Sequence, residues 1–147
     1  MHKVREKNRT VYEEVVEELK TLIARTLDTL KPKLVILYGS FVRGDWHEGS
    51  DLDVLLISDN VPPSFKDRWD LLYDVVKGFP IEPHIYTTQE FEEMLTHGRM
   101  TVLDALTEGE TLHADDEFYK KTTQMLKEVM KKLNPKKTNI GWELRKP

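Results

Sequence analysis

Residues 34–57 read LVILYGSFVRGDWHEGSDLDVLLI and decide the fold that we predict for this chain. Two apolar runs, residues 34–38 and 54–57, lie at the two ends of the stretch. Each is typical of a buried β-strand, because aliphatic and β-branched residues continue without polar alternation and stop at turn-forming residues. The segment between them is rich in glycine, serine and aspartate, the residue types of tight turns and ligand sites. We therefore predict two strands with a functional site in the connection between them.

Gly39 and Ser40 directly follow the first of these strands. Glycine allows a ligand to approach the backbone closely. Ser40 would open a short helix over residues 40–43, and the free amides of its first turn would face an anion. The pattern predicts a phosphate-binding position at this point.

Asp51 and Asp53 stand at the start of the second strand. Alternation along a strand places both carboxylates on one face and Leu52 on the other, with the two Cα atoms about 6.5 Å apart. Two carboxylates at this spacing suit hard cations, and magnesium together with substrate phosphates fits best. Aspartates that only cap a turn are the simpler alternative, but they would not explain why two charges lead straight into an apolar strand.

Four other motifs compete for these residues, and each fails on local grounds. Gly39 and Gly44 have the spacing of a phosphate loop, but Asp45 and Trp46 occupy the positions where lysine and serine or threonine are required. A calcium loop is excluded because Leu56 would occupy the position of its turn glycine. The second histidine of a zinc-peptidase helix and the second glycine of a nucleophile elbow are both missing.

The remaining pattern is Gly-Ser at 39–40, ten residues, and Asp-Leu-Asp at 51–53, in the order strand, helix, loop and strand. It resembles the nucleotidyltransferase signature of the DNA polymerase beta superfamily, specifically its smallest members, the minimal nucleotidyltransferases. Arg43 and Ser50 also match common choices in that family. The resemblance extends to about residue 110. It implies an α/β (α+β) fold, with a small mixed β-sheet of three to four strands flanked by helices.

The resemblance also implies an activity and a set of site residues. Such enzymes transfer a nucleoside monophosphate, here expected to be AMP, from a nucleoside triphosphate to an acceptor hydroxyl and release pyrophosphate. Asp51 and Asp53 would be catalytic and would bind magnesium, with two ions expected. The residues expected to contact the nucleotide are Gly39, Ser40, Arg43 and Ser50. A surface ion pair is the alternative role for Arg43.

A third strand is expected over residues 80–86, with Glu82, His84 and Tyr86 on one face. Proline at position 83 favours an edge strand or the beginning of a strand. The family usually carries a third carboxylate here, most often aspartate, and Glu82 is the best match for this catalytic and metal-binding position. His84 could be a base, a substrate contact or an ordinary half-buried histidine. The last is favoured, because the sequence shows no partner for it.

Helical spacing of apolar residues predicts the supporting elements. An N-terminal helix is expected over about residues 10–30, and another over residues 65–77 that ends at Gly78. Trp69 and Tyr73 lie on the apolar stripe of the second helix. We interpret them as core residues rather than as a platform for base stacking.

Further elements are expected in the second half of the chain. Thr88 would cap one helix, and a short helix is expected over residues 101–106. A short strand over residues 110–114 and a final amphipathic helix capped by Asp115 and Asp116 would follow. These elements complete the sheet and its helical cover.

The composition is typical of one folded domain. A chain of 147 residues buries about two-thirds of its unfolded surface. We divide it into an N-terminal helix (about 10–30), a catalytic core (about 33–110) and a basic C-terminal helix and tail (about 115–147). The absence of cysteine excludes disulfides, thiolate catalysis and cysteine-ligated zinc. The first residues lack the apolar segment of an export signal and no run is long enough to span a membrane, so we expect a cytoplasmic protein.

Basic residues are concentrated at the C-terminus. Residues 120–147 contain nine of the 22 basic residues and two of the 26 acidic ones. Such a tail could attract nucleic acid or an acidic partner, but no nucleic-acid-binding motif supports the first. A helix end whose charges are paired within the protein is the plainer explanation. Trp142 and Leu144 are the apolar anchors expected beyond the helix.

The resemblance implies several classes of acceptor. Minimal nucleotidyltransferases are often paired with a helical HEPN protein, which some of them adenylylate and neutralise as antitoxins. Other relatives modify small molecules or RNA. The short chain favours a protein acceptor or a partner subunit. The alternative is a non-catalytic binding module that restrains a HEPN-like partner by contact alone.

Overall fold

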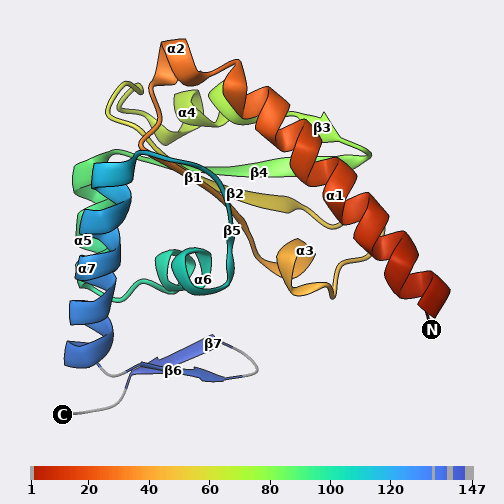
Figure 1. The fold of residues 1–147 in the computed structure, drawn as a ribbon. Coiled ribbons are helices and arrows are strands. Elements are labelled where there is room, and N and C mark those ends of the chain that lie inside the picture. The colour runs from red at the N-terminus through yellow and green to blue at the C-terminus, as the bar shows by residue number, and fades with distance from the viewer. Residues whose placement is uncertain (1, 134, 139–140, 145–147) are drawn as a thin grey trace.

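The computed structural model describes residues 2–133, 135–138 and 141–144, with side chains described over residues 9–133. A five-stranded mixed sheet in the order β3-β4-β2-β1-β5 forms the centre of the molecule (Figure 1). The predicted class, a small mixed sheet flanked by helices, is confirmed, although the sheet has five strands rather than three to four. The strands are β1 (Leu34–Tyr38), β2 (Leu52–Ile57), β3 (Val75–Val76), β4 (Phe79–Tyr86) and β5 (Glu110–Ala114).

Strand pairing brings separate parts of the sequence to one place on the sheet. β1 and β2 are antiparallel, with Tyr38 opposite Asp53. β2 and β4 are parallel, with Asp53 beside Glu82. β5 is antiparallel to the other side of β1, which places β1 inside the sheet. The register therefore aligns carboxylates from two neighbouring strands.

Helices cover both faces of the sheet, which explains the continuous apolar runs in β1 and β2. Alternate side chains of these strands pack against α1 on one face and against α5, α6 and α7 on the other (Figure 1). All five residues of β1 are consequently buried. The helices are α1 (His2–Ala24), α2 (Leu27–Leu30), α3 (Ser40–Arg43), α4 (Phe65–Leu72), α5 (Thr88–Thr96), α6 (Met100–Glu108) and α7 (Asp116–Leu133).

The N-terminal helix differs from the prediction of one element over residues 10–30. α1 begins at His2 and ends at Ala24, and the one-turn helix α2 follows. At the break the Thr26 hydroxyl donates a hydrogen bond to the Ile23 carbonyl at 2.7 Å. Threonine competes in this way with the regular helical pattern, so periodicity alone did not reveal the interruption.

The prediction of one helix over residues 65–77 is wrong for the second half of that range. α4 ends at Leu72, and β3 forms a hairpin with the start of β4. The two turn residues, Lys77 and Gly78, both have positive φ, 52° and 84°. This conformation is typical of a two-residue hairpin turn. Gly78 therefore closes a hairpin instead of ending a helix.

Capping residues in the second half of the chain are close to the predicted ones. α5 is capped by Thr87 rather than Thr88, in a reciprocal capping box with Glu90. Asp115 accepts a hydrogen bond from the Phe118 amide at 3.0 Å and so caps α7. α6 is longer than the predicted helix at both ends, and the predicted strand over residues 110–114 is confirmed as β5.

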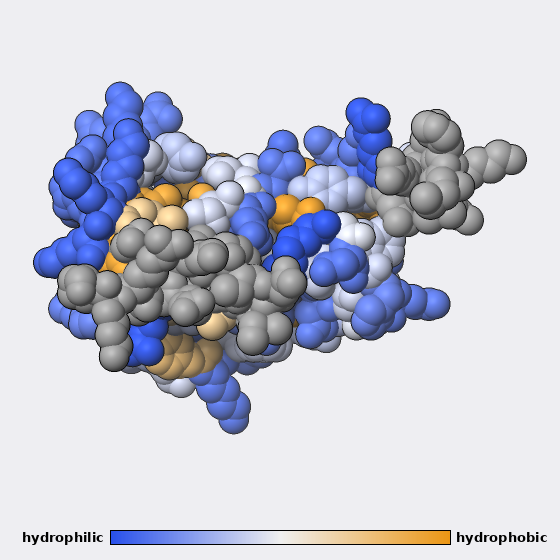
Figure 2. Space-filling view, turned by 90° about the horizontal axis from the view of Figure 1, so that it is seen from below, coloured by the Kyte–Doolittle hydropathy of each residue, from blue (hydrophilic) through white to orange (hydrophobic). Residues whose placement is uncertain are grey.

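The C-terminal segment contains a hairpin that the sequence analysis did not predict. β6 (Pro135–Thr138) and β7 (Gly141–Leu144) pair antiparallel and form a separate two-stranded sheet. The side chains expected to anchor the tail, Trp142 and Leu144, lie outside the described side chains. The view from below shows, in the part that is coloured, a mostly hydrophilic surface with small hydrophobic areas (Figure 2). No helix in the described parts of the chain combines the length and hydrophobicity of a membrane span.

Candidate active site

Gly39 connects β1 to α3, and its conformation requires glycine for two reasons. Its φ is +88°, which side-chain-bearing residues rarely adopt. A Cβ atom at this position would also collide with the Asp53 carboxylate. The predicted short helix over residues 40–43 is confirmed as α3, with Ser40 as its first residue. The predicted phosphate-binding backbone therefore lies directly against a carboxylate of β2.

Three half-buried side chains converge beside this glycine. Asp53, Glu82 and His84 each offer one ligand atom, and these atoms lie within 4.8 Å of one another. Asp53 and Glu82 are neighbours in the β2–β4 register, and His84 is two residues further along the same face of β4. His84 Nε2 lies 3.2 Å from Asp53 Oδ1. We call these three residues the acid group.

The acid group brings like charges together. The pKa of Glu82 is raised by its hydrogen bond with Asp53, by burial and by the negative charge of Asp53, against a lowering contribution from His84. Two carboxylates that share a site disfavour the ionised form of each other. A divalent cation between them would remove this repulsion. The donor set therefore fits a metal ion, with two carboxylate oxygens and one imidazole nitrogen.

Asp51 occupies a different position from the rest of the predicted site. It precedes β2 and is exposed, whereas the intervening Leu52 is fully buried. Asp51 does not belong to the acid group. Its charge is the smallest of the contributions to the raised pKa of Glu82, the largest of which is the hydrogen bond with Asp53. The structure thus brings Asp53 and Glu82 together and leaves Asp51 at the exposed side of the site.

The two remaining nucleotide-binding candidates make contacts within the protein. Arg43 lies 3.8 Å from Asp45 and 3.8 Å from Glu108, which agrees with the ion-pair alternative. Ser50 is buried, and its hydroxyl accepts a hydrogen bond from the His47 amide at 3.0 Å. The Ser50 amide donates back to the His47 carbonyl at 3.0 Å. Ser50 therefore closes the turn that leads into β2.

Tyr38 lies beside the acid group and His84 belongs to it, although neither was predicted as a site residue. The Tyr38 hydroxyl has a raised pKa, first because of burial and second because of the negative charge of Asp53. Its ring lies 5.6 Å from the His84 ring, measured between centroids. The sequence could have predicted His84 as a site residue, because it follows Glu82 by two residues and therefore lies on the same face of the strand. Tyr38 could not be predicted in this way, because its position depends on the pairing of β1 with β2.

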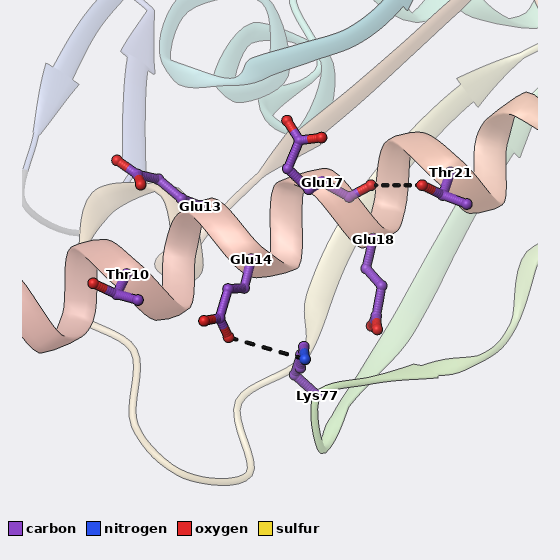
Figure 3. A pocket seen from close by; sticks show the side chains of 7 residues that line it. All are labelled: Thr10, Glu13, Glu14, Glu17, Glu18, Thr21 and Lys77. Carbon is purple, nitrogen blue, oxygen red and sulfur yellow. Dashed lines mark hydrogen bonds and ion pairs between the residues drawn. The ribbon is translucent and has the colours of Figure 1, made fainter.

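A hollow on the outer side of α1 contains none of the predicted site residues (Figure 3). Glu14 extends toward Lys77, and the two charged atoms are 3.9 Å apart. Glu13 and Glu17 point away from Lys77. These carboxylates diverge along an exposed helix, unlike those of the acid group. The surface is therefore a solvated helix face and gives no support for a second metal site.

Comparison with known proteins identifies the family. Residues 12–108 match the family model described as nucleotidyltransferase domain. A candidate protein adenylyltransferase of Methanocaldococcus jannaschii, MJ1305, is 29% identical over 107 residues, covering 69% of this chain and 71% of the relative. A second one from the same organism, MJ0141, is 36% identical over 83 residues, covering 50% of this chain and 80% of the relative.

A solved structure agrees with the fold, and a second one shows a weaker likeness. A nucleotidyltransferase candidate from Sulfolobus solfataricus aligns with a TM-score of 0.52 at 12% identity, covering 75% of this chain and 89% of that chain. A chain from the complex of the tri-AMPylated Shewanella oneidensis HEPN toxin with MNT antitoxin aligns with a TM-score of 0.46 at 16% identity, covering 81% and 92%. Since the family model spans well over half of the sequence, this chain belongs to the nucleotidyltransferase domain family.

Proposed function

We propose that this protein transfers AMP from ATP to a hydroxyl group of a protein acceptor, in the cytoplasm. The observation that carries the proposal is the convergence of Asp53 and Glu82 beside Gly39, where no side chain fits. Membership of the nucleotidyltransferase family supports the reaction class. Both M. jannaschii relatives are named for protein adenylylation, which supports AMP as the transferred group and a protein as the acceptor.

The proposed reaction forms a bond between the acceptor oxygen and the α-phosphorus. The bond between the α-phosphorus and the bridging oxygen to the β-phosphate breaks, and pyrophosphate leaves. The Gly39 amide and the Ser40 hydroxyl would hold the departing phosphates, and Arg43 would contact them as well. Glu82 in its ionised form would orient the acceptor hydroxyl and accept its proton. Ser50 would contribute by holding the loop next to the nucleotide.

Magnesium is the proposed cofactor, with two ions expected. Asp53 and Glu82 would hold one ion, and Asp51 would add a carboxylate from the exposed side of the site. Bound magnesium would offset charge on the attacking and leaving oxygens. The raised pKa of Glu82, caused first by its hydrogen bond with Asp53, supports this assignment, because a divalent cation bound between the two carboxylates would offset their repulsion.

We propose a HEPN-family protein as the acceptor, which would make this chain an antitoxin. Family membership supports this, because the minimal nucleotidyltransferases that the chain resembles are commonly paired with such proteins. The names of the M. jannaschii relatives agree with a protein acceptor. Nucleic acid has no comparable support.

The test is transfer of label from radioactive ATP in the presence of magnesium, with cell extract and any copurifying protein. Wild type should label a protein band, and Asp53→Asn should reduce that label by about 10³-fold, since metal-bound charge stabilisation is worth several kcal/mol. Circular dichroism should show the same fold for both proteins. Equal labelling by Asp53→Asn would refute the proposed role of the acid group.

The second candidate is a binding module that restrains its partner by contact alone. Two observations favour it: Asp51 is separate from the acid group, and Arg43 is engaged in ion pairs. This function predicts a stoichiometric complex that survives Asp51→Ala, and no label transfer with any of the four nucleotides. Magnesium-dependent transfer by wild type would exclude it as the sole function.

A further inference from the structure

An exposed aromatic surface adjoins the acid group on the outer side of β4. Among the described residues, eight large hydrophobic side chains are exposed, and five of them lie between residues 65 and 75. Trp69 and Tyr73, which the sequence analysis interpreted as core, are 41% and 49% exposed and stack on each other with centroids 6.0 Å apart. Such a concentration of exposed aromatic residues is typical of an interaction surface.

A pocket connects this surface to the acid group. α4 supplies Phe65, Arg68 and Trp69 to its lining, and β4 supplies residues that include His84 and Tyr86. We call it the aromatic pocket. His84 belongs to both the aromatic pocket and the acid group, and its Nε2 atom lies 3.2 Å from Asp53. A ligand in the pocket would therefore be a direct neighbour of the proposed reacting centre.

Arg68, in the wall of the aromatic pocket, is fixed by several contacts and has a compensated charge. Arg68 is 4% exposed and pairs with Glu90 at 2.7 Å. Its Nε donates to the Pro62 carbonyl at 2.6 Å, and its guanidinium lies 4.6 Å from the Phe65 ring centroid. Because Glu90 already balances the charge of Arg68, the pocket is poorly suited to a triphosphate. Aromatic walls suit an apolar or aromatic side chain.

The order of elements across the sheet places the aromatic pocket on the acceptor side of the reaction. Gly39 follows β1, Asp53 lies on β2, and Glu82 lies on β4, so the pocket at the outer side of β4 comes last. Phosphoryl transfer needs the attacking and leaving oxygens roughly in line. If pyrophosphate leaves toward Gly39, the acceptor must approach from the opposite side, which is the side of β4 where the aromatic pocket lies.

We propose that the aromatic pocket binds the segment of the acceptor protein that carries the hydroxyl group, through an apolar or aromatic side chain of that segment. This inference rests on the proposed transfer to a protein. The pocket thus determines which polypeptide can reach the acid group. The aromatic pocket binds the acceptor, whereas Gly39 and the carboxylates bind the nucleotide.

The test compares Trp69→Ala with a matched control, Tyr119→Ala, which removes an aromatic ring that is 44% exposed on α7. Labelling of the acceptor band by radioactive ATP is measured at several dilutions of cell extract, and the Kd for magnesium-ATP is measured separately. Trp69→Ala should lower labelling efficiency by about tenfold or more, through the apparent KM for the acceptor. Tyr119→Ala should match wild type, and the Kd for magnesium-ATP should be equal in all three proteins.

Trp69→Phe should retain most of the labelling, since it keeps an aromatic ring in the pocket wall. Wild-type labelling by Trp69→Ala would overturn the inference. A weaker Kd for magnesium-ATP in Trp69→Ala would overturn it too, because the pocket would then belong to the nucleotide. If wild type labels no protein, the proposed function itself fails. This result differs from failure of the inference, because wild type and all variants then lack a labelled band.

Discussion

Two groups of charged side chains lie next to β4, and they are built in opposite ways. Arg68 and Glu90 are unlike charges 2.7 Å apart, and backbone carbonyls accept the remaining hydrogen bonds of the arginine. Asp53 and Glu82 are like charges brought together by strand register, with His84 beside them. The first arrangement holds α4, β4 and α5 together. The second contains repulsion that a cation would relieve.

The pKa values of the two glutamates show the same contrast. Burial alone would raise the pKa of Glu90, but hydrogen bonds from Arg68 and Thr87 and the charge of Arg68 outweigh it and hold the pKa below its usual range. The pKa of Glu82 is raised, first by its hydrogen bond with Asp53. A carboxylate whose ionised form is disfavoured inside a folded protein is typical of a functional site rather than a structural one.

After Asp53→Asn, the largest effect is expected from Glu82→Gln on nucleotide transfer. Loss of this carboxylate should reduce label transfer by at least about 10²-fold, because the cation loses a charged ligand. Glu93→Gln, on the exposed side of α5, is the matched control and should transfer at the wild-type rate. Full activity of Glu82→Gln would show that another carboxylate, with Asp51 as the first candidate, completes the site.

The next largest effect is expected from Glu90→Ala on stability. Glu90 is the charged partner of the buried Arg68 within residues 9–133, so its loss should lower the free energy of unfolding by about 3 kcal/mol. Urea denaturation measures this change. Glu92→Ala breaks the more exposed pair with Lys121, in which the lysine is 62% exposed, and should cost less than about 1 kcal/mol. Equal losses in the two variants would remove the structural role assigned to Arg68 and Glu90.

A smaller effect is expected from Glu82→Gln on stability in the absence of metal. The folded protein raises the pKa of Glu82 above 4.5 and so favours the protonated form of this side chain. The stability that this preference contributes is complete below pH 4.5, and it is lost as the pH rises through the folded pKa. Glu82→Gln should therefore be more stable than wild type at neutral pH, by less than about 1 kcal/mol after solvent screening. Thermal melts at pH 4 and pH 7 would show whether the difference is confined to the higher pH.

Glu90 should show the opposite pH dependence. Its folded pKa is depressed below 4.5, so its stabilising contribution is present above that pH and is lost as the pH falls through the folded pKa. The stability difference between wild type and Glu90→Gln should consequently shrink in acid. A difference that grows as the pH falls would contradict the assigned direction.

Local patterns predicted the elements that depend on neighbouring residues. The apolar runs of β1 and β2 match the predicted strands because helices bury both faces of the sheet. The alternation in β4 correctly separated Glu82 and His84 from Ile81 and Ile85. The contact between His84 and Asp53 was not predictable, because it depends on the parallel register between strands that are far apart in the sequence.

The hairpin of β3 and β4 shows why the α4 region was misread. Val76 continues the helical spacing of Trp69 and Leu72, and a two-residue strand leaves no alternation that a sequence pattern could reveal. Pairing with Phe79 and Pro80 makes this segment a strand. Because α4 then ends at Leu72, Trp69 and Tyr73 are exposed instead of buried.

The central claim, that the acid group is a cation site, is tested most directly by metal binding to the protein itself. Manganese can stand in for magnesium, and electron paramagnetic resonance then reports the fraction bound to wild type, Glu82→Gln and Glu93→Gln. We predict that wild type and Glu93→Gln bind equally, and that Glu82→Gln binds at least about tenfold more weakly. Equal manganese binding by all three proteins would contradict the assignment of the acid group as the metal site.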